Sequence, residues 1–414
     1  MRRWVEPAIY AASAVFAAAA VEFGLTPHRA WGRVAAIPYA VAALVLVVVC
    51  LRAPQLMTRG VRAAVAVTLL AAVTLAPMAI QIGRRGADAL GYHAQSEVLV
   101  VEQASSALAR GDNPYDAVFD DEILARRRAG TQTHFPYLPG MLALGAVPDS
   151  WGPLADARVA FAVVTLLVFG IAAVMARRRE RFVRALQVLV VLPTGALILA
   201  TGGDDLPVLA LMLLSLVLVD RRHPVAGGVA IGLAAATKQL AWPLLPFLVF
   251  AAVDLDGEPA RGRTATAAGL TMLPVLVPFV VWNPSAFIED VVRFPLGMGA
   301  DASAAASPTL GRLVSGAVPG AETVLSILLP VGLLVGAAVV LIRRPPRDPA
   351  AAALAAGVFI GAAVLFAPAA RIGIAVYAVN LAVWWWVLRP DADAAETKVS
   401  ENAPSTLTVT PGAA

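Results

Sequence analysis

The feature that most constrains this chain is a series of long apolar runs spread along most of its length. A helix of about 20 apolar residues is needed to cross a bilayer core about 30 Å thick. These runs therefore predict an all-α, polytopic transmembrane protein. The clearest candidate spans are 5–24, 34–51, 63–82, 157–175, 184–200, 206–219, 265–282, 323–342, 349–367 and 372–388.

The composition excludes the main alternatives to a membrane protein. Apolar residues make up 59% of the 414 residues and charged residues 14%, against roughly 25% charged in an average soluble domain. A soluble enzyme, a disordered chain and a fibrous repeat are all excluded by these figures. The net charge of +4 is better explained by loop arginines facing an anionic leaflet than by nucleic-acid binding.

The stretch 225–253 is too long for one simple span, because it would measure roughly 43 Å as a single helix. It also contains Lys238, Pro243 and Pro246. Two short spans that meet near Lys238 are the better prediction, and they bring the expected total to about 12 crossings. The segment 135–149 is open to two interpretations, a short span or a re-entrant segment.

The arginines predict the orientation of the spans, because basic loop residues are enriched on the cytoplasmic side. In this count both termini are cytoplasmic, and two long loops near 83–134 and 283–322 face outward. We expect a transmembrane domain over 1–389 and a disordered cytoplasmic tail over 390–414. The single Cys50 excludes an intramolecular disulfide. The arginines on the predicted inner face are Arg2, Arg3, Arg52, Arg59, Arg62, Arg177, Arg178, Arg179, Arg181, Arg184, Arg221, Arg222, Arg261, Arg263, Arg343, Arg344 and Arg347.

The first outer loop contains the candidate catalytic acids. Glu97 and Glu102 lie in a segment of helical composition just after the third predicted span. A carboxylate at this depth suits a general base at the membrane face. The alternative is that both belong to the solvated face of an interfacial helix.

Two further segments of this loop contain candidate binding residues. Asn113 and Tyr115 lie in an Asx–Pro turn, for which a purely structural role is the favoured interpretation and ligand binding the alternative. His134 and Tyr137 lie in a segment rich in proline and aromatic residues that leads into an apolar run. They are expected either to line a lipid-accessible groove or to belong to an interfacial aromatic belt.

Asp204 and Asp205 follow two glycines between two apolar segments on the outer side. Adjacent acids in so short a turn lie close to the bilayer. They can cap the following helix, orient sugar hydroxyls or hold a divalent cation. The pair alone does not distinguish these roles.

Lys238 is the most informative single residue. Only two of the 32 basic residues are lysines, Lys238 and Lys398, and Lys238 lies within an apolar stretch. It has to snorkel, lose its proton or find an anion. A lipid phosphate suits it, with Gln239 as a neighbouring donor, and a carboxylate partner such as Asp204 or Asp205 is the alternative. Further candidates for the phosphate are Arg293 and Arg371.

These elements, in this order, resemble glycosyltransferase family 87, whose multispan GT-C-fold members include actinobacterial mannosyltransferases. The matching elements are the acid Glu97, the turn 111–115, the element 135–139, the turn 202–205, the segment 232–238 and the loop 283–287. The sequence departs from the family pattern in two places. Glu97 stands where aspartate is usual, and Leu138 separates Tyr137 from Pro139.

The resemblance implies a membrane enzyme with an extracytoplasmic active site in the cell membrane. A hexose, here mannose, moves with inversion from a polyprenyl-phosphate carrier to a lipid or glycan acceptor. It implies Glu97 as general base, with Glu102 as second choice, and Lys238 at the leaving phosphate. No cofactor, metal or nucleic acid is expected. A multispan transporter or lipid flippase is the competing hypothesis, because intramembrane charge and proline-broken spans also suit transporters.

Overall fold

The computed structural model describes residues 2–87, 93–117, 119, 134–299, 307–369 and 371–389, and the predicted tail 390–414 lies outside them. Within the described residues all regular structure is helical, apart from one isolated bridge between Val253 and Pro259. The predicted all-α fold is therefore confirmed. The longer helices are α1 (Val5–Phe23), α2 (Thr26–Arg52), α3 (Arg59–Leu69), α4 (Ala76–Ala87), α5 (Ser96–Ala109), α8 (Ala157–Met175), α9 (Arg179–Leu186), α10 (Pro193–Thr201), α11 (Asp205–Asp220), α12 (Pro224–Thr237), α13 (Leu244–Ala251), α14 (Arg261–Trp282), α16 (Leu310–Ala317), α17 (Ala321–Arg343), α18 (Pro349–Phe366) and α19 (Ala375–Leu388).

Short helical segments connect these helices. Their bounds are η1 (Arg2–Trp4), η2 (Pro54–Leu56), η3 (Leu70–Leu75), η4 (Pro139–Met141), α7 (Leu142–Gly145), η5 (Asp149–Ala155), η6 (Gln187–Val191), η7 (Gln239–Ala241), α15 (Pro284–Ile288), η8 (Glu289–Arg293) and η9 (Ile372–Ile374).

Seven helices in the described part of the chain are long and apolar enough to cross a membrane, which confirms a multi-pass membrane protein. An eighth span forms if α9–η6 and α10, bent by 43° at their junction, are counted together. Of the other crossings predicted, α12, the α13 region and the α19 region are shorter apolar helices, and α11 has 16 residues. The total of about 12 stays a prediction.

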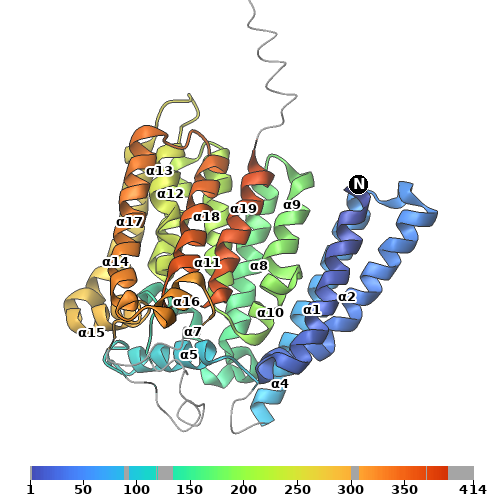
Figure 1. Ribbon diagram of the computed structural model, residues 1–414, viewed down its shortest axis with the longest axis horizontal. Coiled ribbons are helices and arrows are strands. Elements are labelled where there is room, and N and C mark those ends of the chain that lie inside the picture. Colours follow the sequence, from blue (N-terminus) through green and yellow to red (C-terminus); the bar gives the residue numbers. More distant parts are fainter. Residues whose placement is uncertain are drawn as a thin grey trace, which may run out of the picture.

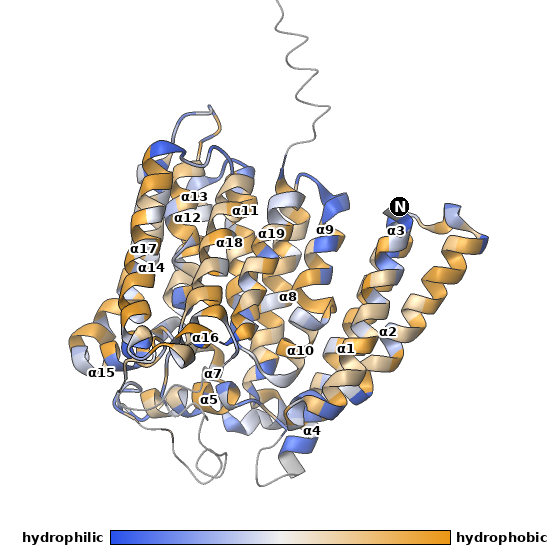
Figure 2. Ribbon diagram, viewed as in Figure 1, coloured by the Kyte–Doolittle hydropathy of each residue, from blue (hydrophilic) through white to orange (hydrophobic). Residues whose placement is uncertain are grey.

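The helices stand side by side, with α5 lying across one end of the bundle (Figure 1). The α1–α2 pair lies at one flank, and α4, α7 and α15 gather at the same end as α5. Figure 2 shows apolar residues over most of the length of the helices and hydrophilic residues concentrated at both ends. We call the end that carries α5 the site end and the opposite end the arginine end.

Two π-helical segments join the α1–α4 flank to the rest of the bundle. Segments η3 and η6 pack together, and Pro193, two residues after the end of η6, has no backbone N–H to continue the hydrogen-bond ladder. The Thr74 hydroxyl donates to the Val190 carbonyl at 2.6 Å, and the Tyr39 hydroxyl donates to the Val191 carbonyl. Side chains from the flank thus satisfy carbonyls that the irregular segment leaves free.

The arginine end takes its name from arginines of distant segments that meet there. Glu6 pairs with Arg62 at 3.4 Å and with Arg184 at 3.1 Å, and Arg177 pairs with Asp220 at 3.7 Å. These contacts place the N-terminus and the α2–α3, α8–α9 and α11–α12 turns at one end. The sorting of arginines is as the sequence predicts, and the cytoplasmic location of this end stays a prediction.

The chain breaks at Lys238, as the length of 225–253 predicts. Helix α12 ends at Thr237, and Lys238 has extended backbone angles (φ −154°, ψ 134°) before η7 begins. The ambiguous segment 135–149 contains only η4 and the four-residue helix α7. At 1.5 Å per residue neither element is long enough to span a bilayer.

Candidate functional site

Tight backbone turns bring Asp204, Asp205 and Lys238 together at the site end. Helix α10 ends at Thr201 and is capped by Gly202, whose φ of 108° favours glycine. A Cβ at Gly202 would lie 2.1 Å from the Val98 side chain, so glycine also permits the close approach of α5. The turn then delivers the two acids to the start of α11, beside the chain break at Lys238.

The three charged side chains form a compact, largely buried group that we call the acid–lysine cluster, together with Tyr377. Lys238 Nζ lies 2.7 Å from Asp204 Oδ1 and 2.5 Å from Asp205 Oδ1. The Tyr377 hydroxyl donates to Asp205 Oδ1 at 2.9 Å. Lys238 Nζ also lies 5.1 Å from the centre of the Tyr137 ring, a cation–π distance. The carboxylate partnership, one of the two alternatives for Lys238, is thus present.

The cluster leaves two buried acceptor atoms without a partner among the described residues. Asp204 Oδ2 makes no hydrogen bond, and neither does Gln239 Oε1, although Gln239 Nε2 donates to the Pro136 carbonyl at 3.1 Å. Burial raises the pKa of Asp204 to about 6, although the charge of Lys238 opposes the shift. Unsatisfied buried acceptors are costly, and a hydroxyl-rich ligand is one means of satisfying them.

Glu97 lies next to this cluster, in the first turn of α5. Its Oε1 accepts a hydrogen bond from Arg371, and its Oε2 accepts from the Ser96 hydroxyl at 3.2 Å. Glu97 interacts electrostatically with Asp204, and Arg371 interacts with both Tyr137 and Asp204. The Glu97–Arg371 pair and the acid–lysine cluster therefore form one site at the site end of the bundle.

The two members of the pair differ in accessibility. The Arg371 side chain is 37% exposed and the Glu97 side chain 14%. Burial alone would lower the pKa of Arg371, but the charge of Glu97 and their hydrogen bond outweigh it, so that its pKa is raised. Arg371 therefore remains a cation that is open to a further anionic ligand.

Glu102, the second candidate base, is held in a different network. Arg85 reaches its two carboxylate oxygens at 3.0 and 2.5 Å, and the Ala157 amide donates to it at 2.9 Å. Arg85 also bonds Asp156 at 2.8 Å, and Asp156 is bonded by the fully buried Arg158. The network ties α5 to α4 and α8 and so fixes the helix that carries Glu97.

Asn113 and Tyr115 form the predicted turn and support the segment that contains Tyr137. Asn113 Oδ1 accepts from the Tyr115 amide at 3.1 Å, as in an Asx turn. The Tyr115 hydroxyl donates to the Tyr137 carbonyl at 2.9 Å, and its ring packs edge-on against Phe135 and Phe287. In this structure both residues orient the backbone near Lys238.

His134 pairs with Asp290 of η8, in the second loop that the sequence predicts to face outward. His134 Nδ1 lies 2.8 Å from Asp290 Oδ1, and the Phe135 amide donates to Asp290 Oδ2 at 3.0 Å. Burial raises the pKa of Asp290, against the opposing hydrogen bond from His134. The pair fastens η8 to the segment that leads to Tyr137.

Arg293 is not brought to the acid–lysine cluster. Among the described residues it forms an ion pair with Glu289, four residues earlier, at 3.5 Å, and its side chain is 59% exposed. Of the candidates named from the sequence, the structure brings together Glu97, Tyr137, Asp204, Asp205, Lys238 and Gln239.

Sequence reasoning did not identify Tyr377, Asp156 or Arg158. Arg158 had a usable signal, because a charged residue at the start of the apolar run 157–175 requires a partner. The sequence contains no such signal for Tyr377, because tyrosine is common in apolar segments. Within the described residues no group of three or more His, Cys, Asp and Glu is arranged to hold a metal ion, and metal independence stays a prediction.

No curated protein sequence matches the chain. Among solved structures, it is similar to the crystal structure of ArnT from Cupriavidus metallidurans bound to undecaprenyl phosphate, with 18% identity and a TM-score of 0.47. That alignment covers 81% of this chain and 62% of the ArnT chain.

The sequence model of glycosyltransferase family 87 matches residues 135–368, which is more than half of the 414 residues. The matched range contains the acid–lysine residues Asp204, Asp205 and Lys238, whereas Glu97 and Arg371 lie outside it. The protein therefore belongs to glycosyltransferase family 87.

Proposed function

We propose that this membrane glycosyltransferase moves a hexose, mannose by family resemblance, from a polyprenyl-phosphate carrier to a lipid or glycan acceptor on the extracytoplasmic face. The observation that carries the proposal is the meeting of Glu97, Arg371 and the acid–lysine cluster at one end of a membrane bundle. Family membership favours this function over a transporter or flippase. A lipid-linked donor also suits a cationic site at the end of membrane helices.

In this proposal Glu97 is the general base and Arg371 receives the donor phosphate. The phosphate competes with Glu97 for Arg371, so that donor binding releases the carboxylate. Glu97 then takes the proton of the acceptor hydroxyl while the oxygen of that hydroxyl attacks the anomeric carbon of the sugar. The bond between that carbon and the phosphate oxygen breaks, and the lipid phosphate leaves with the negative charge that Arg371 stabilises.

The acid–lysine cluster has the properties of a sugar-binding site. Asp204 Oδ2 and Gln239 Oε1 offer unused acceptors, and hexose hydroxyls are suitable donors. Lys238 balances the charge of the two carboxylates and holds them in place. The sequence also predicts that Lys238 contacts the donor phosphate. For this contact the phosphate has to displace one carboxylate from Lys238 Nζ or bind Nζ in addition to both.

The purified full-length protein in lipid nanodiscs can be tested with polyprenyl-phosphate mannose, polyprenyl-phosphate glucose and the corresponding nucleotide sugars. Cell-envelope lipid extract serves as the acceptor. The proposal expects transfer from a polyprenyl-phosphate hexose and none from a nucleotide sugar, with an inverted anomeric configuration in the product by NMR. Transfer from nucleotide sugars alone would contradict it.

The acceptor can be identified independently of the donor assay. In a deletion strain, mass spectrometry of envelope glycolipids and glycans should show one species that lacks a single hexose. Re-expression of the wild-type chain should restore that species, and the Glu97→Gln variant should not. An unchanged envelope in the deletion strain would argue against a lipid or glycan acceptor.

A further inference from the structure

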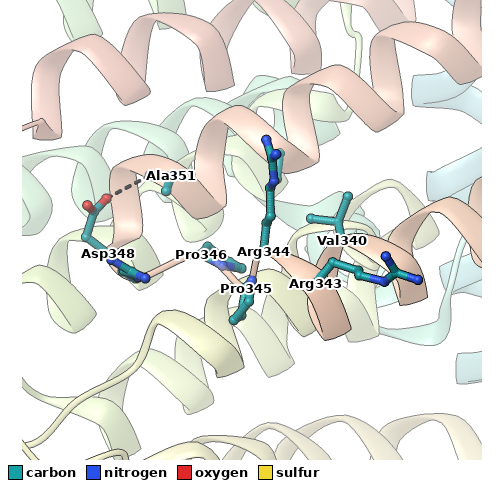
Figure 3. Close-up of a pocket in the computed structure, with 9 residues that line it drawn as sticks. Val340, Arg343, Arg344, Pro345, Pro346, Asp348 and Ala351 are labelled. Atoms are coloured by element: carbon teal, nitrogen blue, oxygen red, sulfur yellow. Dashed lines mark hydrogen bonds between the residues drawn. The ribbon is translucent and has the colours of Figure 1, made fainter.

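A pocket at the arginine end, far from Glu97 along the helices, concentrates positive charge. It has a volume of about 430 Å³ and lies where α17 ends and α18 begins. Arg343, Arg344 and Arg347 line it together with Asp348. Figure 3 shows the Arg343 and Arg344 side chains pointing in different directions, next to the short linker that contains Pro345 and Pro346. The two prolines fix φ and keep this linker stiff.

The three guanidinium groups in this pocket are available for a ligand. Among the described residues none of them has a hydrogen-bond or ion-pair partner, in contrast to Arg62 and Arg184 at the same end, which both bind Glu6. Asp348 faces the pocket, but its Oδ1 already accepts from the Ala351 amide at 2.8 Å and caps α18 (Figure 3). Its single charge leaves the pocket with an excess of two positive charges.

The helix that leads to the pocket is unusually exposed. Only 6% of the apolar window of α17 is buried, against 22% to 39% for the other six candidate spans. Large apolar side chains are exposed along it up to the residue before Arg343, among them Leu334, Val339 and Ile342. An apolar surface that ends in unpaired cations is complementary to an amphiphile with an anionic head.

We propose that this pocket binds the headgroup of an anionic phospholipid in the leaflet at the arginine end, with the acyl chains lying along α17. The site is separate from the transfer site, and it does not depend on the proposed donor or acceptor. A phosphodiester oxygen has the charge and the acceptor geometry that guanidinium donors favour. The arginine end of a membrane helix also lies at the depth of lipid headgroups.

The test compares two charge-matched variants of the full-length protein by native mass spectrometry and thermal-shift measurement in detergent. One variant replaces Arg343, Arg344 and Arg347 with Gln, and the control replaces Arg52, Arg59 and Arg221, which are exposed arginines of the same end. The probes are phosphatidylglycerol and phosphatidylcholine with identical acyl chains. The wild type and the control should prefer phosphatidylglycerol by about tenfold, and the pocket variant should bind both lipids equally.

Three results would overturn the proposal. The wild type could show no preference for phosphatidylglycerol, or the control variant could lose as much preference as the pocket variant. Soluble glycerol phosphate could also shift the melting temperature as strongly as the lipid does, which would indicate a free anion as the ligand. Unchanged transfer activity of the pocket variant in a neutral lipid confirms that the variant is folded.

Discussion

The two ends of the helix bundle use charge in different ways. At the site end, Lys238 contacts two carboxylates and a tyrosine ring, and its side chain is only 12% exposed. At the arginine end, the Arg263 side chain is 56% exposed in its pair with Asp254, and Arg343 has no partner among the described residues. A charged side chain that is buried away from water needs a nearby partner of opposite charge, whereas a charged side chain at the level of the lipid headgroups does not. The difference points to the site end as the place of chemistry.

The largest stability effect is expected where the buried cluster loses its cation. Lys238→Met leaves Asp204 and Asp205 facing each other without compensation, and breaking a buried pair costs about 3–5 kcal/mol. The melting temperature in detergent should fall markedly. The triple variant that also carries Asp204→Asn and Asp205→Asn has no unpaired buried charge, and it should regain much of the lost stability. Equal stability of the single and the triple variant would show that the charges are not coupled.

Arg371 is expected to affect activity more than stability. Removing one preorganised electrostatic contact to a developing charge typically costs about 10²–10³ in rate. Arg371→Gln should lower kcat by this range and weaken donor binding, while Arg371→Lys retains part of the activity. Arg293→Gln is the matched control, because Arg293 lies in an exposed pair outside the cluster. Comparable losses in the two Gln variants would remove Arg371 from the proposed mechanism.

The network beneath Glu97 should make the protein sensitive to acid. Burial alone would raise the pKa of Asp156, but hydrogen bonds and charges from Arg158 and Arg85 outweigh it and lower the pKa. A lowered carboxyl pKa contributes stability above the unfolded value of about 3.9 that is lost as the pH falls below it. The melting temperature should therefore fall more steeply from about pH 5 to about pH 2 for the wild type than for Asp156→Asn. Parallel curves would contradict this.

The smallest effect is expected for an exposed pair at the arginine end. Arg263 and Asp254 form an ion pair whose arginine side chain is 56% exposed. Exposed pairs contribute about 0–1 kcal/mol, so Arg263→Gln should change the melting temperature by little. If Arg263→Gln lowered the melting temperature as much as Lys238→Met, the proposed difference between buried and exposed charges at the two ends would be wrong.

The sequence predicted the helical fold, the break at Lys238 and the family, because apolar length and lone intramembrane charge are local signals. It did not predict how the charges pair. The Arg371–Glu97 contact joins residues 274 positions apart, and Tyr377 reaches Asp205 across 172 positions. Pairings of this kind depend on how α5, α11 and α19 pack. The pairing of Arg293 with Glu289 was missed for the same reason, since the position of Arg293 along the chain does not show where its side chain points. Its role at the donor phosphate stays a prediction.

The account rests most directly on Glu97, and one measurement tests it. Single-turnover transfer from a polyprenyl-phosphate hexose should be compared in Glu97→Gln and Glu102→Gln, two isosteric changes on the same helix. Loss of a general base should slow the Glu97 variant by about 10²–10⁴ without loss of stability. The Glu102 variant should lose stability and keep most of its chemical rate. A Glu97 variant with wild-type rate, or the reverse order of the two variants, would contradict the account.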